Sequence, residues 1–169
     1  MRILALDPGT NLGWALGDGA KLVGFGTQKF PKTEHSGERF ETFGVWLADV
    51  GTHPLVDKVV YEKPLGRFAT SQAQVDLSIG IKTRIEEFCW KYGVELQPVP
   101  IPTLKKATTG NGRAEKEDMV AAVNRIFGLT LTPKEHDTAD ALALLHYARK
   151  DVRLLNDGHV WVTEEGDPF

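Results

Sequence analysis

Apolar residues near the start of the chain fall into short runs with the length and pattern of β-strands. Residues 2–6 form a largely apolar run that ends at Asp7-Pro8-Gly9, a sequence typical of a turn. Gly19-Ala20 separates two further short segments and indicates a β-hairpin. The predicted strands are residues 2–6, 13–18, 21–28, 57–62 and 94–99.

Between and after these strands, apolar residues recur at spacings of three and four, the period of an amphipathic helix. One such series follows Ser36, a candidate N-cap: Phe40, Phe43, Leu47 and Val50. Gly128 is expected to end a later helix, and Thr132-Pro133-Lys134-Glu135 is expected to open the last one with a capping box. The predicted helices are residues 37–50, 72–92, 115–127 and a final helix that runs to about Lys150.

The order of these elements predicts the fold class. A strand–helix–strand connection is normally a right-handed crossover between parallel strands, whereas the hairpins make the first three strands antiparallel. The chain is therefore expected to be an α/β protein with a mixed five-stranded sheet flanked by helices. We expect residues 1–150 to form one domain and residues 151–169 to form a C-terminal tail, with an apolar patch at Val160-Trp161-Val162.

The composition is that of a globular chain. It has 169 residues, of which 41% are hydrophobic, and this suits one domain with a real core. No run of eighteen apolar residues could span a membrane, and the apolar start becomes polar at Asp7, too soon for a signal peptide. The single cysteine, Cys89, has no internal partner for a disulfide. We therefore expect a soluble protein of a reducing compartment such as the cytoplasm.

The charge is unusual for a nucleic-acid-binding protein. The chain carries 20 Lys and Arg against 23 Asp and Glu, a net charge of −3, whereas such proteins often carry a positive excess. Without the four acidic residues discussed next, this balance becomes +1. The basic residues also cluster, which indicates either solvated surface charge or a surface for a polyanion. The clusters are Lys63 with Arg67, Lys82 with Arg84, and Lys105, Lys106, Arg113 and Lys116.

Four acidic residues are placed where their carboxylates could meet. Asp7 and Glu62 each end a predicted strand, and parallel neighbouring strands would bring both to one edge of the sheet, where open α/β sheets bind ligands. Asp137 and Asp140 are three apart on a predicted helix and share one face. Singly, Asp7 could start a turn and Asp137 could favour a helix N-terminus.

Together, these carboxylates would repel each other unless they were neutralised. Divalent cations with oxygen ligands would neutralise them, and Mg²⁺ favours a few carboxylates together with substrate phosphates. We therefore expect two Mg²⁺ ions per active site, with Mn²⁺ as a substitute. Such a pair can activate a water and stabilise the leaving oxygen of a phosphodiester.

Four segments resemble motifs of the RuvC family of Holliday junction resolvases, in order and with compatible spacing from residue 3 to about 148. Leu6-Asp7-Pro8-Gly9-Thr10 with Gly13 is similar to the family's opening motif, and Val60-Tyr61-Glu62 to its second acidic strand. Residues 109–116 (TGNGRAEK) resemble its T-G-x-G-x-A-x-K segment, and residues 136–143 (HDTADALA) its D-x-x-D-A-L-A helix.

The resemblance implies a ribonuclease-H-like fold and an endonuclease of DNA recombination and repair in a bacterial or phage-infected cell. Such an enzyme is a homodimer that binds a four-way DNA junction and nicks two strands of like polarity, leaving 5′-phosphate and 3′-hydroxyl ends. By position, the implied metal ligands are Asp7, Glu62, Asp137 and Asp140. Lys116 would contact the scissile phosphate or help the leaving oxygen, and Lys105 and Lys106 would hold the DNA backbone. Arg113 and Arg67 are further candidate DNA contacts.

The segment after Glu62 departs from the family pattern. Family members carry an aromatic residue shortly after this glutamate, which wedges into the junction centre. Here Leu65 stands nearest that place, and the first aromatic residue is Phe68. Phe68 either supplies the wedge at a loop tip that Gly66 could re-aim, or packs under the following helix.

Residues 72–92 are the candidate dimer interface, by resemblance and by sequence. Leu77 and Ile81 fall outside the apolar stripe of Val75, Ile79 and Ile85, so this helix is apolar on more than one side. A helix of this kind is usually packed on two sides. The alternative is a helix sunk deeper into its own core.

Three other functions fit parts of the sequence. A broader flap or branched-DNA nuclease would use the same fold and the same acids. A non-catalytic junction-binding protein is disfavoured by the complete acidic set, since buried carboxylates without a metal are costly. Actin-like and sugar-kinase ATPases also open with a strand and D-x-G-T, but they need a second phosphate motif that this sequence does not show at a strand end.

Overall fold

The computed structural model describes residues 1–30, 32–63 and 71–156 and contains the mixed sheet that the sequence predicts. Five strands lie in the order β3-β2-β1-β4-β5, with β1 antiparallel to β2, β2 antiparallel to β3, and β1, β4 and β5 mutually parallel. The hairpin turns at Gly19, whose φ of 54° is readily adopted only by glycine. The strands are β1 Arg2–Asp7, β2 Asn11–Asp18, β3 Lys21–Lys29, β4 Lys58–Lys63 and β5 Glu95–Pro100.

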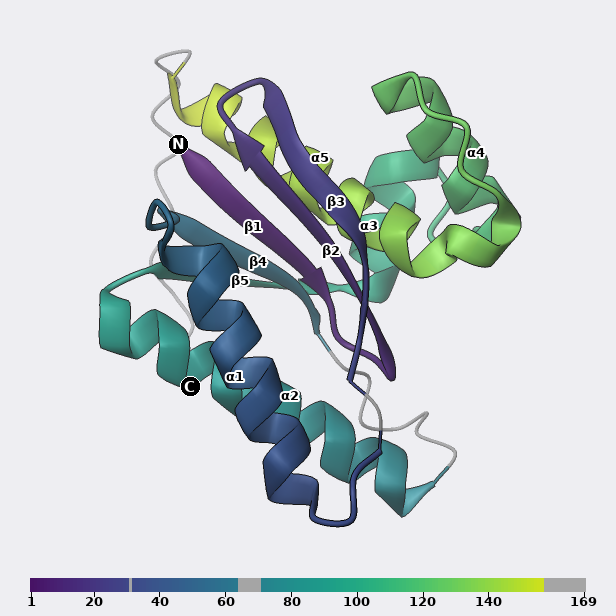
Figure 1. Ribbon diagram of the computed structural model, residues 1–169. Helices are drawn as coiled ribbons and strands as arrows, with labels where there is room; N and C mark the ends of the chain where they lie inside the picture. Colours follow the sequence, from purple (N-terminus) through teal and green to yellow (C-terminus); the bar gives the residue numbers. More distant parts are fainter. Residues whose placement is uncertain (31, 64–70, 157–169) are drawn as a thin grey trace, which may run out of the picture.

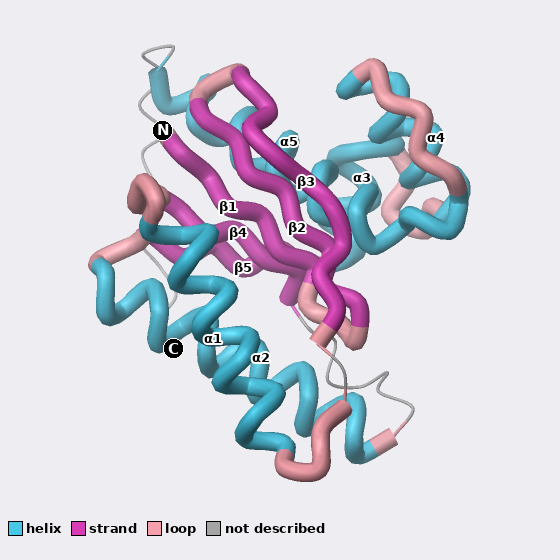
Figure 2. Tube along the Cα trace, viewed as in Figure 1, coloured by secondary structure: helices cyan, strands magenta, loops and turns pink. Residues whose placement is uncertain are grey.

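Helices cover both faces of this sheet. Figures 1 and 2 show α1 and α2 on one face, and α5 with the α3–α4 pair on the other. The helices are α1 Ser36–Thr52, α2 Gln72–Tyr92, α3 Ile101–Thr109, α4 Lys116–Phe127, the short 3-10 helix η1 Pro133–Glu135 and α5 His136–Asn156. Every predicted helix is present, but α3 was not predicted. The prediction of Ser36 as an N-cap is wrong, because His35 holds that position and the helix begins at Ser36.

The alternation of side chains along the strands builds one core on each face. On β1, Leu4 and Leu6 join the cluster under α1 and α2, whereas Ile3 and Ala5 join the cluster under α3, α4 and α5. The period of two in a strand imposes this division. This alternation also determines the face of the sheet on which the last side chain of each strand lies.

Small residues let α5 lie against β2. A Cβ on Gly13 would stand 1.8 Å from the carbonyl oxygen of Asp137, and one on Gly17 would stand 2.3 Å from the guanidinium of Arg149. Arg149 in turn donates a hydrogen bond of 2.7 Å to the carbonyl of Lys21. Glycine is therefore needed both where the start of α5 meets β2, at Gly13, and where a later turn of α5 meets it, at Gly17.

The two apolar sides predicted for the 72–92 helix need a correction. Leu77 and Ile81, placed outside the core stripe by the sequence, are buried together with Ile85 in the protein's own core. Ile79, expected to lie inside that stripe, is instead 58% exposed. The helix rests on both the sheet and α1, since a Cβ on Gly80 would strike the ring of Phe40, and this double packing buries the second side.

The division at residue 150 stays a prediction. The backbone of α5 continues past that point to Asn156. The patch Val160-Trp161-Val162 lies outside the described residues. No helix within the described ranges is long and apolar enough to cross a membrane.

Candidate active site

Two acidic side chains end adjacent parallel strands on the same face of the sheet. The register of β1 on β4 pairs Leu6 with Tyr61, so Asp7 and Glu62 are the next residues on the two strands. Because Ile3, Ala5 and Val60 belong to the core under α5, alternation turns Asp7 and Glu62 toward α5 as well. The strand-end arrangement expected from sequence is therefore present.

The start of α5 brings the other two carboxylates to this face. The predicted capping box is present, with the Glu135 carboxylate accepting from both the backbone N–H and the hydroxyl of Thr132 at 2.8 Å. The buried Thr138 hydroxyl lies 2.9 Å from that of Thr27 on β3 and ties the first turn of α5 to the sheet. Asp137 and Asp140 flank this tie on the same helix.

Electrostatics show that the four carboxylates form one group. Burial raises the pKa of Asp7 well above its usual range, and the negative charges of Glu62, Asp140 and Asp137 raise it further. The Lys116 ammonium opposes these effects. Every acid nominated from the sequence therefore lies within electrostatic reach of Asp7.

The pKa values of Glu62 and Asp140 are raised by the same causes, burial and neighbouring carboxylates. Burial, and then the Asp140 carboxylate, raise the pKa of Glu62 to about 7. Burial raises the pKa of Asp140 to about 6. The protonated form of His136 lowers this pKa, Asp137 raises it, and Lys105 and Lys116 lower it. Lys105 opposes the rise at both acids, which places its positive charge beside the group.

This donor set fits hard divalent cations. All four candidate ligands are carboxylates, the preferred donors of Mg²⁺, and burial raises the pKa of three of them, Asp7, Glu62 and Asp140. Within the described ranges, however, no three acidic, His or Cys side chains are gathered closely enough to enclose an ion. The mutual repulsion that raises these pKa values also favours separation of the carboxylates, and the site is defined by their shared face and electrostatic coupling.

Lys116 reaches the acidic group from α4. Gly110 ends α3 with a φ of 83°, and the Asn111 side chain accepts from the backbone N–H of Arg113, so the chain turns tightly before α4. At the start of α4, the Lys116 Nζ lies 3.1 Å from Nε2 of His136. The T-G-x-G-x-A-x-K segment thus builds the loop that presents this lysine to the acids.

The remaining predicted DNA contacts are placed differently. Lys106 and Arg113 are exposed, and neither is among the charges that shift the pKa values of the acids. Arg67 and Phe68 lie outside the described residues, as does Leu65. The roles of Lys106, Arg113 and Arg67 as DNA contacts, and of Phe68 as a wedge, stay predictions.

His136 lies within the motif at residues 136–143, but the sequence indicated no role for its side chain. In the structure it touches both Lys116 and Asp137, with its Nδ1 3.1 Å from the Asp137 carboxylate. Its only signal in the sequence was its place next to Asp137. A residue twenty positions away supplies its second partner, which no local pattern reveals.

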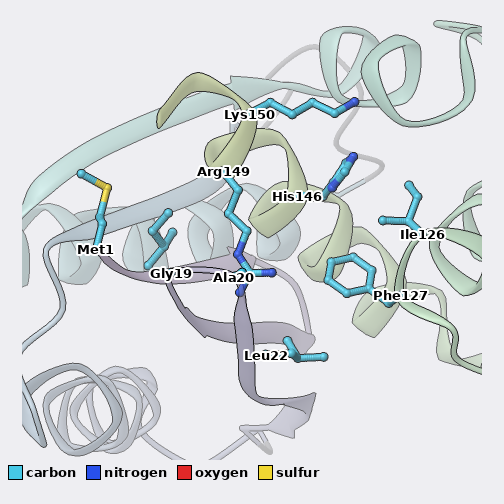
Figure 3. Close-up of a pocket in the computed structure, with 10 residues that line it drawn as sticks. Met1, Gly19, Ala20, Leu22, Ile126, Phe127, His146, Arg149 and Lys150 are labelled. Carbon is cyan, nitrogen blue, oxygen red and sulfur yellow. The ribbon is translucent and has the colours of Figure 1, made fainter. Parts of the chain in front are cut away.

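A separate cavity of about 860 Å³ lies at the opposite end of α5 (Figure 3). Met1, Leu22, Phe127, His146 and Arg149 are among its lining residues, and none of the four acids is. Twelve residues of helix separate Asp137 from Arg149, about 18 Å at 1.5 Å per residue. This cavity contains none of the carboxylates, so the candidate chemistry stays at the acidic edge.

Comparisons with known proteins point to one family. The family profile described as Crossover junction endodeoxyribonuclease RuvC matches residues 92–146. The relative of that name from Corynebacterium efficiens is 29% identical over 154 residues, covering 85% of this chain and 66% of the relative. The relative from Frankia casuarinae is 30% identical over 155 residues, covering 85% of this chain and 86% of the relative.

Solved structures give the same result for the fold. The structure titled "T. thermophilus RuvC in complex with Holliday junction substrate" superposes with a TM-score of 0.75 at 25% identity, covering 89% of this chain and 96% of that one. A yeast mitochondrial Holliday junction resolvase matches with a TM-score of 0.67 at 11% identity, over 92% of this chain and 80% of that one, which supports the ribonuclease-H-like fold alone. On the strength of its similarity to the Frankia relative across most of both sequences, this chain belongs to the RuvC family.

Proposed function

We propose that this protein is a Holliday junction resolvase, an endonuclease that hydrolyses phosphodiester bonds in four-way DNA. The observation that carries the proposal is the meeting of Asp7, Glu62, Asp137 and Asp140 on one face, beside Lys105 and Lys116, in a member of this family. The related Thermus protein was solved with a Holliday junction substrate. Since the named relatives are bacterial, the cytoplasm is the proposed compartment.

Metal dependence follows from the donor set, and we propose two Mg²⁺ ions held by Asp7, Glu62, Asp137 and Asp140. When bound, such ions supply an activated water and stabilise the leaving oxygen. The chain's own part is to hold the carboxylates in place through β1, β4 and the first turn of α5.

The basic residues beside the acids are the proposed contacts for the DNA phosphate. Lys105 and Lys116 offset the negative charge of the acids and leave the edge able to accept a phosphate. Water adds to phosphorus, the bond from phosphorus to the 3′ oxygen breaks, and a proton passes to that oxygen. The products are a 5′-phosphate and a 3′-hydroxyl. Lys116 is the candidate group for stabilising the departing 3′ oxygen.

Cleavage of labelled DNA tests this function. A four-way junction, a Y-fork and a linear duplex of the same arm sequence are incubated with the protein and Mg²⁺, and the products are run on a denaturing gel. We expect paired nicks in the junction and none in the duplex. Equal cutting of the Y-fork would indicate a broader branched-DNA nuclease. No cutting of any branched substrate would refute the proposal. ATP hydrolysis in a separate assay with ATP and Mg²⁺ would favour the kinase-like alternative.

Amide variants identify the acids. Asp7→Asn, Glu62→Gln, Asp137→Asn and Asp140→Asn keep the shape of each side chain but remove its charge. Each should abolish cleavage and retain the fold and most of the affinity for the junction. An Asp7→Asn protein that cuts at the normal rate would exclude this site.

We also propose a homodimer through α2, because paired nicks need two active sites at a fixed separation. The exposed apolar residues of this helix are Ile79, 58% exposed, and Trp90, 87% exposed. They are eleven residues apart, three turns along one face. The buried Leu77 and Ile81 cannot serve, and glutamate at either would disrupt the core.

Sedimentation velocity tests the dimer. The unchanged protein should sediment as a dimer, and the pair Ile79→Glu and Trp90→Glu should convert it to a folded monomer that leaves unpaired nicks. Val23→Glu, at an exposed apolar position on β3, is the matched control and should stay dimeric. A monomeric unchanged protein, with and without junction DNA, would exclude this assembly.

A further inference from the structure

We infer that His136 is a positioning residue for Lys116, holding the lysine ammonium at the acidic edge while leaving its charge free for a DNA phosphate. The observation is a continuous chain of polar contacts from α4 to α5. Lys116 Nζ lies 3.1 Å from His136 Nε2, and His136 Nδ1 lies 3.1 Å from Asp137 Oδ1. The catalytic role of this contact rests on the proposed function, whereas the contact itself can be tested without DNA.

The chemistry of Lys116 and His136 fixes the direction of their hydrogen bond. An ammonium has three donors and no acceptor, so Lys116 donates and His136 Nε2 accepts. A neutral imidazole with an accepting Nε2 carries its proton on Nδ1, the ring nitrogen that lies 3.1 Å from Asp137 Oδ1. One tautomer of His136 is therefore compatible with both contacts.

Lys116 needs such an anchor because of its place in the fold. It is the first residue of α4, where the helix dipole disfavours a positive charge. A lysine side chain also has about 2 kcal/mol of rotamer entropy, which opposes any single position. The His136 Nε2 acceptor on α5 offsets both the unfavourable helix dipole and the loss of rotamer entropy.

An imidazole suits this task better than a carboxylate. A carboxylate against Lys116 would form an ion pair and neutralise the ammonium, whereas neutral His136 accepts the hydrogen bond and leaves the positive charge in place. The Asp137 contact in turn orients the ring, which is only 28% exposed at its side chain. The close contact with one oxygen of Asp137 also resembles the outer contacts that commonly orient metal-ligating carboxylates.

The packing of α4 on α5 supports the contact. Val120 and Val123 of α4 share one buried core with Leu142 and Leu145 of α5, so the two helix starts are held together. His136 and Lys116 are the first residues of these helices. Their separation therefore depends on the core and not on a flexible loop alone.

The tautomer provides a test that needs neither DNA nor metal. Imidazole carbon and nitrogen chemical shifts of the full chain labelled at histidine are recorded at mildly alkaline pH, and the His136 signals are assigned from their loss in His136→Gln. We expect the Nδ1–H tautomer, and its reduction in Lys116→Met. A dominant Nε2–H tautomer in the unchanged protein would overturn the inference.

Cleavage kinetics provide the second test. At saturating enzyme, His136→Phe should slow a single turnover roughly 10- to 100-fold, the usual effect of an orienting contact, while junction affinity changes little because Lys116 keeps its charge. His136→Gln places an amide that can still accept near Nε2 and should recover most of the rate. His146→Phe, farther along α5, is the matched control and should cleave normally.

A double variant distinguishes positioning of Lys116 from a general structural role. If His136 acts through Lys116, then His136→Phe should add no further loss in a Lys116→Met background. Additive losses, or normal turnover by His136→Phe, would overturn the inference. An unchanged protein that cuts no junction would refute the proposed function instead, and the tautomer measurement would still decide the contact.

Discussion

Gly13→Ala is the most direct test of how the active site is assembled. Gly13 lies on β2 opposite Asp7, and an added Cβ would stand 1.8 Å from the carbonyl oxygen of Asp137 and 2.4 Å from its carbonyl carbon. Nonbonded carbon contacts begin near about 3.5 Å, so relief requires a movement of roughly 1 to 1.5 Å. The obstacle is backbone and not a flexible side-chain tip. The first turn of α5 must therefore move away from β1, and the carboxylates of Asp137 and Asp140 move with it.

This displacement should affect activity more than stability. A misplacement of about 1 Å at reacting groups can cost on the order of 100-fold in rate. Overpacking typically costs about 1–3 kcal/mol, and the lower chain entropy of unfolded Ala returns about 0.4–1 kcal/mol. The net loss of roughly 1–2 kcal/mol should lower Tm by about 2–8 °C, since a chain of this size shifts about 2–4 °C per kcal/mol.

The assay pairs single-turnover cleavage of a labelled junction with a thermal melt. Gly44→Ala on α1 is the matched control, because no atom lies within 4 Å of its added Cβ. It should cleave normally and be stabilised by about 0.5–1 kcal/mol through helix propensity. A Gly13→Ala protein with the normal turnover rate and the normal Tm would refute the reasoning.

Three further predictions concern charge. In EDTA, the pKa of Glu62 is about 7 in the folded protein against 4.5 for the free side chain. This difference contributes about 3 kcal/mol to the free energy of unfolding. The contribution is fully present below pH 4.5 and is lost as pH rises through about 7. Tm should fall across that window, and Glu62→Gln should flatten the fall; a Tm that rises from pH 5 to 7.5 would contradict it. Asp7→Asn should raise Tm of the metal-free protein at pH 8 because it removes a buried charge, and calorimetry that finds a lower Tm would count against this. Lys105→Ala should reduce the slope of log affinity against log salt by about one phosphate contact, whereas Lys21→Ala, at the far hairpin, should leave it unchanged. Equal slopes for the two variants would mean that Lys105 is a surface charge only.

Local patterns predicted the elements that make the acidic edge. The short apolar run before Asp7 and the strand before Glu62 identified both strand ends, and the spacing of Asp137 and Asp140 identified a shared helix face. The connection through helices then implied parallel strands, and so a common edge. These inferences needed only local periodicity and the handedness of crossovers.

The features that sequence did not predict depend on contacts between distant residues. Helix α3 was not predicted because its nine residues are too few to show a helical apolar period, with Leu104 as the buried residue. Pro102 lies in its first turn, where proline is tolerated. The buried side of α2 was misassigned because Gly80 lets α1 approach closely and covers residues that the helical period leaves outside. The meeting of His136 with Lys116 likewise arises from the packing of two helices.

The connectivity of the site bears on when the enzyme first becomes able to cut DNA. Asp7 and Glu62 come from the first half of the chain, whereas Asp137 and Asp140 come from its last helix. During synthesis the N-terminal strands emerge first, at about 5–20 residues per second. The nascent protein therefore carries two of its four acids for several seconds before α5 leaves the ribosome and docks over Gly13. Cleavage competence therefore requires the docking of α5, and a product truncated before that helix lacks Asp137 and Asp140.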